Sequence, residues 1–509
     1  MSILQNNILS LRSIFYCLYF FISTLSAQAQ KPKQVEIINA DVLEFDQRYG
    51  KDTKRLIGNV QFKHDDVYMY CDSAHFNSAE NIVDAYSNVH IRQGDTLHLY
   101  GDKIKYMGNT KFAEIRSNVR LIQGKTILTT EFLDFDRIKN VGYYFNKGKI
   151  VDGENELTSL TGYYYTQTRE AFFKTKVLLK NPEYKMYGDT LKYNTRNKTA
   201  YFFGPTTIVS DSNLIYCENG WYNTKTEISQ FNKNAYLTNK KQILKGDSLY
   251  YDRKKQQGRA FRNIQMIDSM QNVILYGNKA QYNELTQASM ITDKTLLVQI
   301  IEKDSLFIHA DTISTSVDTS GKYKNIRAYH KVKMFKTDLQ GKCDSVFYSL
   351  RDSVIQLHRN PVLWSDMHQL TADYIEIHTK NNNVDYIDLQ RAAFIISRED
   401  TIRFNQIKGK NMKGFFVNNK LYKVDITGNG QSLYFPKDKD QLVGANKAES
   451  TNMTIYIKDK KIERIKFITK PNATMSPIED IQNNDLKLKD FKWLEKYRPL
   501  TKSDIFIWQ

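Results

Sequence analysis

A small residue followed by an anchor position, in most copies an acid or an amide, recurs along most of the chain in one hydrophobic frame. The anchors are Asp41, Asp72, Asp102, Glu131, Leu160, Asp189, Glu218, Asp247, Asn278, Asp311, Asp344, Asp373, Lys410 and Asn446. The residue before each anchor is Ala, Cys, Gly, Thr or Ser. Anchors lie about 29 to 33 residues apart until two longer intervals near the end, and repeats of this length are typical of stacked architectures. The sequence therefore favours an elongated stack of about 14 repeats over one compact fold.

The hydrophobic frame predicts strands that bend at the anchor. Around Asp102, for example, Leu99 stands three positions before the anchor, and Ile104 and Tyr106 stand two and four positions after it. Each half alternates with period two, as in a strand with one buried face. The parity changes across the anchor, so a straight strand would turn one apolar half toward water. We therefore expect the strand to bend or bulge at each anchor and the small residue before it, where a small side chain avoids a clash with the neighbouring strand.

A second mark, about 17 residues after many anchors, completes the repeat. It is often Asn followed by an apolar residue, as in Asn88-Val89, Asn118-Val119, Asn234-Ala235 and Asn263-Ile264. Turn pairs such as Gly-Asp and Asn-Lys separate the apolar runs, as hairpins require. Aromatic residues make up 13% of the chain and there are only 8 prolines, which suits an all-β protein. We interpret each repeat as two or three short strands with a corner.

The two ends of the chain differ from the repeats. Residues 1–29 are typical of a secretory signal peptide, with Arg12, an apolar stretch from Ile14 to Leu25 and a small-residue cleavage site. The repeats are expected over residues 30–468, with a further division near 300–325 left open. Residues 469–509 are expected to form a polar, partly helical tail, and its Trp493, Tyr497 and Trp508 could cap the last strand or dock a partner.

Three cysteines follow the signal peptide, and each stands directly before an anchor. Cys71, Cys217 and Cys343 are four or five repeats apart, which at about 4.8 Å per strand is roughly 20 Å or more. A disulfide needs Cα atoms within about 7 Å. We therefore expect small corner fillers and no intramolecular disulfide.

The chain is strongly basic, with a formal charge of +17. An exported basic protein could meet anionic lipid, phosphorylated glycolipid or acidic polysaccharide, whereas export argues against a nucleic-acid partner. The alternative is a solvated face whose lysines keep strand edges from pairing with other chains.

No catalytic or metal-binding motif stands out. The sequence contains no zinc-protease His pair, phosphate loop, nucleophile elbow or Cys/His cluster, so no metal and no cofactor are expected. The recurring anchor acids fit turn and side-chain-to-backbone bonding, because Leu160 and Lys410 dispense with the carboxylate. We expect a protein that is not an enzyme. A carbohydrate-active β-helix would need paired carboxylates in one groove.

Four segments carry a family resemblance: Gly58-Asn59-Val60, Gly101-Asp102-Lys103-Ile104, Gly188–Tyr193 and Gly277-Asn278-Lys279-Ala280. Together they resemble the OstA-like (organic-solvent-tolerance) family of periplasmic lipopolysaccharide transport proteins, over most of residues 35–468. The resemblance implies a twisted β-jellyroll whose two sheets fold like an open V, with lipid A acyl chains on its apolar inner face. It also implies a periplasmic location and partners in the outer-membrane translocon and the inner-membrane transport complex. Exposed first and last strands would allow head-to-tail self-association.

The candidate lipid-binding residues belong to the apolar frame, most of them two and four positions after an anchor. They are Leu43, Phe45, Phe76, Leu99, Ile104, Tyr106, Leu133, Phe135, Leu191, Tyr193, Leu249, Tyr251, Tyr282 and Ile375. Each methylene moved from lipid to water costs about 0.8 kcal/mol, so a lipid that crosses an aqueous compartment needs a continuous apolar path. The alternative is a filled core, in which case the protein would be a structural or adhesive exported β-solenoid.

Overall fold

The computed structural model describes residues 33–45, 48, 50–211, 213–239, 241–301, 304–381, 383–438, 441–459, 461–480 and 486–508. The expected signal peptide, residues 1–29, lies outside the described residues. The chain forms two compact units, which we call unit 1 (to Glu170) and unit 2 (from Ala171). The domain boundaries expected from the sequence stay predictions.

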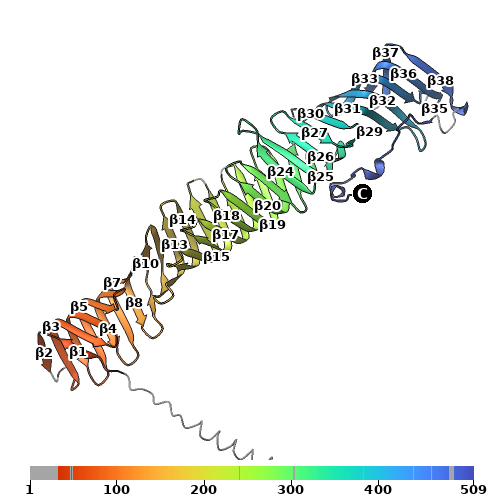
Figure 1. The fold of residues 1–509 in the computed structure, drawn as a ribbon. Coiled ribbons are helices and arrows are strands. Elements are labelled where there is room, and N and C mark those ends of the chain that lie inside the picture. Colours follow the sequence, from red (N-terminus) through yellow and green to blue (C-terminus); the bar gives the residue numbers. More distant parts are fainter. Residues whose placement is uncertain are drawn as a thin grey trace, which may run out of the picture. The chain divides into compact units, whose positions relative to one another are not determined.

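Unit 1 is an antiparallel meander in which each long strand pairs with the next along the chain (Figure 1). Its strands are β1 (Glu36–Asn39), β2 (Val42–Phe45), β3 (Thr53–His64), β4 (Val67–Asn77), β5 (Ile82–Gln93), β6 (Leu97–Met107), β7 (Phe112–Gln123), β8 (Thr126–Asp136), β9 (Val141–Tyr144), β10 (Gly148–Asp152), β11 (Asn155–Ser159) and β12 (Thr161–Tyr165). Short strands replace the long ones at both ends of this unit, so that β8 pairs with both β9 and β10.

Unit 2 continues the antiparallel pattern with a second set of strands (Figure 1). They are β13 (Glu170–Asn181), β14 (Tyr184–Asn194), β15 (Thr199–Ser210), β16 (Leu214–Asn223), β17 (Ile228–Thr238), β18 (Gln242–Asp252), β19 (Gln257–Asp268), β20 (Val273–Asn283), β21 (Ala288–Thr292), β22 (Leu296–Ile301), β23 (Asp304–His309), β24 (Thr312–Val317), β25 (Lys324–Lys336), β26 (Leu339–Ser349), β27 (Val354–His358), β28 (Val362–Ser365), β29 (His368–Thr371), β30 (Tyr374–Lys380), β31 (Asn383–Arg398), β32 (Phe404–Val417), β33 (Lys420–Tyr434), β34 (Lys437–Asp438), β35 (Gln441–Leu442), β36 (Gly444–Lys458), β37 (Lys461–Ile468) and β38 (Asn472–Pro477). The labelled helices of the described residues are the 3-10 turns η2 (Ile478–Asp480), η4 (Glu495–Tyr497) and η5 (Asp504–Phe506). The all-β prediction is confirmed, while the number of repeats stays a prediction.

The predicted bulge at the small–acidic pair is confirmed. Between β4 and β5 the pairing register shifts between Tyr70 and Ser73, which bracket Cys71 and Asp72. Between β18 and β19 it shifts between Lys245 and Ser248, at the Gly246-Asp247 pair. The bulge re-aims the strand, so that the apolar residues on both of its sides point to the same interior.

The Asn of the second mark binds the acid of the anchor before it. Asn118 donates from Nδ2 to Asp102 Oδ2 at 2.6 Å, and Asn234 donates to Glu218 Oε1 at 2.7 Å. Asn118 and Asn234 have φ of 53° and 55°, a left-handed conformation that Asn adopts more readily than most residues. The sequence predicted side-chain-to-backbone bonding for the acids. The structure adds this side-chain pair to such bonds as Asn118 N to Glu131 Oε2 at 3.3 Å.

Small residues stand before the anchors because the opposite strand approaches closely there. A Cβ on Gly277 would lie 2.3 Å from Cγ2 of Ile291, and a Cβ on Gly101 would lie 2.5 Å from Cγ2 of Ile115. Both distances are far below an ordinary contact. At two other anchors, Cys71 and Ala372 fill the same corner and are buried.

The bulges divide each meander into two facing layers. We define layer A as the strand segments around the residues before the anchors, such as Val67–Cys71, and layer B as those after them, such as Ser73–Asn77. Phe62 of layer A and Phe76 of layer B have ring centroids 5.9 Å apart, so the apolar sides of the two layers pack against each other. The core of each unit lies between its layers, which is the two-layer arrangement of a β-jellyroll.

Candidate functional site

Most candidate residues point into this interior, as the sequence predicts. Those that are buried are Phe76, Leu99, Ile104, Tyr106, Leu133 and Phe135 in unit 1, and Leu191, Tyr193, Leu249 and Ile375 in unit 2. Tyr251 and Tyr282 are half-buried. Their role in binding stays a prediction.

Leu43 and Phe45 are the exposed members of the set, at 54% and 58%. Leu43 pairs with Leu56, which is fully buried, so Leu43 lies on the inner side of β2. Among the described residues, the core is uncovered at this first part of unit 1.

The inward side chains of unit 1 leave little space at the level where a cavity lies between them. A cavity of about 20 Å³ lies between layers A and B, lined by residues that include Val67, Leu99, Ala113, Phe135 and Arg137. This volume holds about one water molecule. An acyl chain could enter at this level only if the two layers moved apart.

Polar side chains join the layers along the edge away from the bulges, where hairpin turns of layer A meet hairpin turns of layer B. We call this row of contacts the seam. In unit 1, Arg137 of layer B donates to Asp66 of layer A at 3.0 Å, and Lys111 of layer B lies 2.7 Å from Asp65 of layer A. The side chain of Arg137 is only 8% exposed, but that of Asp66 is 64% exposed, so water still reaches this ion pair and its contribution to stability is modest.

A buried histidine extends the seam of unit 1. Tyr106 Oη accepts a hydrogen bond from Arg137 at 2.8 Å and lies within hydrogen-bond distance, 2.7 Å, of His64 Nδ1. Burial lowers the pKa of His64, and the nearby Arg137 charge lowers it further, whereas Asp65 opposes the shift. The neutral imidazole is therefore the favoured form in this network.

A second seam contact in unit 1 uses an amide instead of charges. Gln123 of layer A donates to the carbonyl oxygen of Thr166 at 3.0 Å and accepts from Tyr164 Oη at 2.8 Å. Gln123, Thr166 and Tyr164 are all buried. The amide of Gln123 therefore keeps these two hydrogen bonds only while the layers stay together.

Unit 2 has a seam of the same kind. Lys324 of layer B lies 2.7 Å from Asp268 of layer A, and Gln271 beside it donates to the carbonyl oxygen of Lys322 at 3.0 Å. Further along, Arg253 donates to Glu183. Burial would raise the pKa of Asp268, but the hydrogen bond and charge of Lys324 outweigh it and hold that pKa below its usual range. These contacts are ion pairs and hydrogen bonds whose partners water or a polar headgroup could replace.

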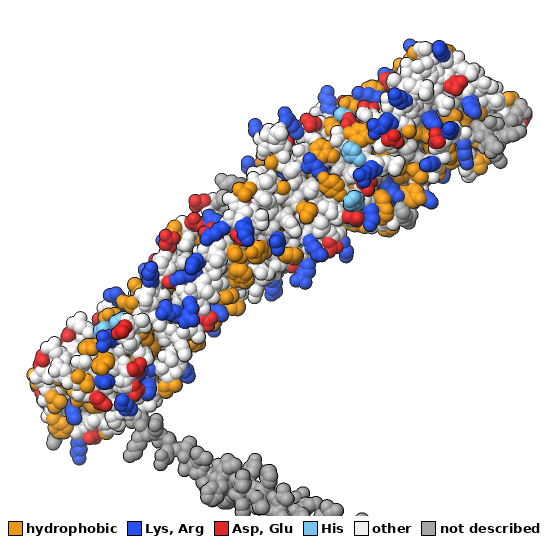
Figure 2. All heavy atoms as spheres, viewed as in Figure 1, with side chains coloured by type: hydrophobic (Ala, Val, Ile, Leu, Met, Phe, Trp, Pro, Cys, Tyr) orange, Lys and Arg blue, Asp and Glu red, His pale blue; other side chains and the backbone are white. Residues whose placement is uncertain are grey.

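The described residues show no cluster of three or more His, Cys, Asp or Glu side chains suited to a metal ion. Cys71, Cys217 and Cys343 are free and buried, as the corner-filler interpretation predicts. Burial raises the pKa of Cys71 and of Cys217 to about 12, so these thiols stay protonated and unreactive. Figure 2 shows Lys and Arg side chains spread over the visible face, with acids between them.

The sequence missed the seam. Two of its contacts occupy equivalent positions, because Arg137 and Arg253 stand six residues after an anchor and their partners Asp66 and Glu183 stand six before one. Other members, such as Asp65 and Lys111, stand at other positions of the repeat, and the sequence showed only turn pairs such as Gly-Asp and Asn-Lys.

Comparisons with known proteins identify the families that the chain resembles. A family model described as "OstA-like protein" matches residues 32–189 and 185–247, and a model described as "LptA/(LptD N-terminal domain) LPS transport protein" matches residues 274–383. Among solved structures, the chain is similar to LptH from Pseudomonas aeruginosa, the LptA homologous periplasmic component of its lipopolysaccharide transport device. The identity is 11%, the TM-score is 0.12, and the match covers 33% of this chain and 80% of that one. A likeness at this score carries no argument. A search of curated proteins found no match. No helix among the described residues is long and apolar enough to cross a membrane.

Proposed function

The chain belongs to the OstA-like family, and we propose that it is a non-enzymatic periplasmic carrier of lipopolysaccharide, which takes the lipid's acyl chains between layers A and B. The observation that supports the proposal is the set of inward apolar residues that lies on both sides of the bulges within each unit. A path built of similar repeats offers sites of similar free energy, so a lipid can move along it without meeting one deep trap.

The acyl chains would enter through the seam. Parting the layers exposes apolar side chains, but an acyl chain replaces the lost contacts and removes its own surface from water. A chain of about 12 methylenes contributes on the order of 10 kcal/mol at about 0.8 kcal/mol per methylene. That is enough to offset a few seam contacts of about 1 to 3 kcal/mol each. The phosphates and sugars would stay outside, where Arg137, Lys111 and Lys324 stand.

The bridge toward the outer membrane, its translocon and the inner-membrane complex are part of the same proposal by family membership. Direction would come from that inner-membrane machine, because the repeats themselves offer no gradient. Head-to-tail self-association stays a prediction.

A second candidate is the structural or adhesive β-solenoid with a permanently filled core. The observation that favours it is the small cavity of about 20 Å³ between the layers of unit 1. Under this alternative the seam never parts and the interior never meets lipid.

A photo-crosslinking amino acid distinguishes the two candidates in living cells. Placed at the inward positions Ile104 and Tyr193, it should form adducts with lipopolysaccharide, whereas at the neighbouring outward positions Lys105 and Lys192 it should not. Absence of adducts at both inward positions, with the protein folded and exported, would contradict the proposal and favour the filled solenoid. Equal labelling at inward and outward positions would place the lipid on the outer surface instead.

A further inference from the structure

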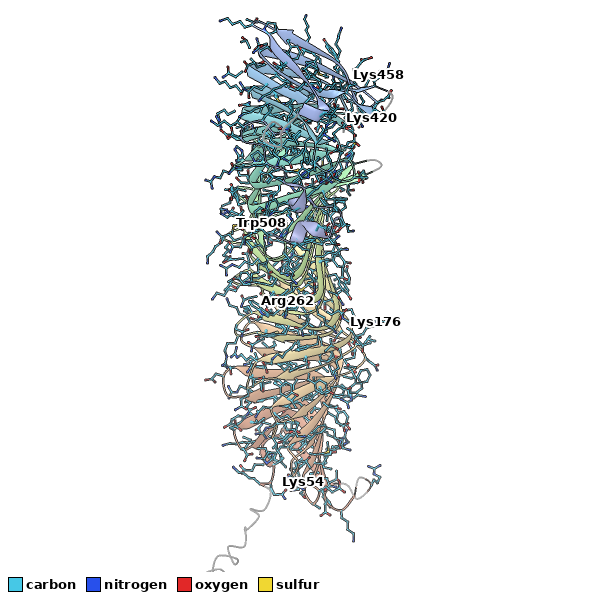
Figure 3. All side chains as sticks on the ribbon, turned by 90° about the vertical axis from the view of Figure 1, so that its right-hand side faces the viewer. Lys54, Lys176, Arg262, Lys420, Lys458 and Trp508 are labelled. Carbon is cyan, nitrogen blue, oxygen red and sulfur yellow. The ribbon has the colours of Figure 1, made fainter. Side chains whose placement is uncertain are left out.

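The C-terminal segment Leu486–Trp508 lies on the outer side of layer A in unit 2. It crosses β32, β29 and β26 in turn, against the order of the repeats. Trp508, labelled in Figure 3, packs on Lys342 of β26. The sequence left open whether this tail caps the last strand; the structure places it on earlier ones. We call this segment the strap.

Three buried glutamines hold the strap, each four positions before an anchor. They are Gln340, Gln369 and Gln406, which are 3%, 0% and 0% exposed. This position is on the outer side of layer A, because the residues three before the anchors point inward. Glutamine on the outer side of a sheet is normally exposed, so the strap is what buries these three.

Two of the glutamines bind the main chain of the strap with both ends of their amide. Gln406 donates to the carbonyl oxygen of Leu486 at 2.8 Å and accepts from the N–H of Leu488 at 2.8 Å. Gln369 donates to the carbonyl oxygen of Lys492 at 2.8 Å and accepts from the N–H of Leu494 at 2.6 Å. In both cases the amide bridges residues i and i+2, as a neighbouring extended strand would. This recognises an extended peptide through its backbone.

Side chains add selectivity to this backbone recognition. Gln340 accepts from Arg498 Nε at 2.8 Å, and Lys408 lies 2.7 Å from Asp490. Leu486 and Leu488 belong to an apolar cluster on the outer side of the strands that includes Phe394, Ile396, Phe404, Leu433 and Phe435, with Phe491 and Trp493 packed against it. These outer apolar residues would face water without the strap.

The end of the strap is also held. Lys342 lies 4.0 Å from the ring centroid of Tyr497 and 4.3 Å from that of Trp508, and the rings of Phe506 and His309 are 4.7 Å apart. Ile505 is 1% exposed. The strap thus occupies a groove with backbone-binding, ionic, apolar and aromatic contacts along its length.

We propose that this groove is a self-recognition site, in which the strap of one copy docks on layer A of a second copy. The glutamine contacts join residues 80 to 158 positions apart in the sequence. Strap and groove are thus separate stretches of the sequence, and a strap delivered by a second copy can offer the same side chains and main-chain groups to the groove. The strap is also the one peptide whose fit to the groove is visible. This inference does not depend on the lipid-binding proposal.

Two complementary full-length variants test the exchange. The first, Gln369→Leu with Gln406→Leu, keeps its strap but loses the backbone-binding amides of its groove. The second, Leu486→Ala with Leu488→Ala and Trp493→Ala, keeps its groove but has a weakened strap. Mixed together, the strap of the first should dock in the groove of the second. A tagged copy of the second variant should then capture at least tenfold more of the untagged first variant than a tagged copy of the first variant captures.

Trypsin provides a second measurement on the same samples. The strap contains Lys487, Lys489, Lys492, Lys496 and Lys502, so its release exposes several cleavage sites. In the first variant these sites should be cut at least tenfold faster than in the wild-type chain, and adding the second variant should restore protection. Gln356→Leu with Gln390→Leu, on the outer side of layer B, is the matched control and should behave as wild type.

Each outcome decides the proposal. A mixture that behaves as the sum of its parts, with no capture and no restored protection, overturns exchange between copies. If the strap of the first variant stays protected from trypsin, the glutamines do not hold it, and the proposed role of the groove is wrong. Capture that persists when both partners carry the weakened strap places the interface elsewhere and also overturns the proposal.

Discussion

Replacing Gly277 with alanine tests why small residues precede the anchors. The added Cβ would lie 2.3 Å from Cγ2 of Ile291, whose side chain is only 1% exposed. The matched change at Gly188, before the anchor Asp189, meets Thr206 Oγ1 at 3.3 Å. Neither glycine has a positive φ, so the two substitutions differ mainly in the space available.

The magnitude follows from these distances. Overpacking of a well-packed core costs about 1 to 3 kcal/mol. Alanine in a strand regains about 0.5 to 1 kcal/mol over glycine. We expect Gly277→Ala to lower the free energy of unfolding of unit 2 by about 1 to 2 kcal/mol, and Gly188→Ala to change it by less than about 0.5 kcal/mol.

Chemical denaturation of the full-length variants measures this difference, and a double mutant confirms its cause. Ile291→Ala alone should cost about 2 to 5 kcal/mol, because it leaves a cavity. Combined with Gly277→Ala it should cost at least about 1 kcal/mol less than the sum, because the clashing Cγ2 is gone. Equal effects of the two glycine substitutions, or strict additivity of the double mutant, would refute the steric explanation of the corner.

Three further predictions concern the anchors, the seam and the cysteines. Asp102→Ala removes the 2.6 Å bond from Asn118 and should lower the free energy of unfolding by about 0.5 to 1.5 kcal/mol; an unchanged denaturation midpoint would contradict the role of this bond. The folded-state pKa of His64 is lowered, so its stabilisation is complete above the unfolded-state pKa of about 6.5 and is lost as the pH falls below it. Urea midpoints should therefore drop between pH 7.5 and 5.5 more in the wild type than in His64→Gln, and parallel drops would contradict this. The thiols of Cys71 and Cys217, with pKa values of about 12, should react with iodoacetamide at pH 8 only after unfolding; rapid labelling of the folded chain would show that these corners are open.

The bulged strands were predictable because their signal is periodic. The parity change around Asp102 required a corner, and the pairing of β6 with β7 has a register shift between Tyr100 and Lys103. The same parity placed Ile104 and Tyr106 inside. Local alternation and a fixed repeat are enough to define which side of each strand is buried.

The seam and the strap were not predictable in the same way, because both join residues far apart in sequence. Arg137 and Asp66 are 71 residues apart, and Arg253 and Glu183 are 70 apart. Both pairs stand six residues after and six before an anchor, but a charged residue in a turn does not reveal which distant turn it meets. The strap left one signal: glutamine recurs four positions before the anchors Asp344, Asp373 and Lys410. A run of amides at an outward position is ambiguous by itself, because a solvated face carries glutamine too.

The central claim is that the space between the layers takes up acyl chains when the seam parts. Mass spectrometry of lipids extracted from the folded protein, purified from its native envelope without added lipid, tests it most directly. The account predicts lipopolysaccharide bound to the wild-type chain and a large loss in a folded variant carrying Ile104→Glu and Leu249→Glu, which place carboxylates in the interior. Wild-type protein with no bound glycolipid, or equal amounts on the wild type and the variant, would contradict it.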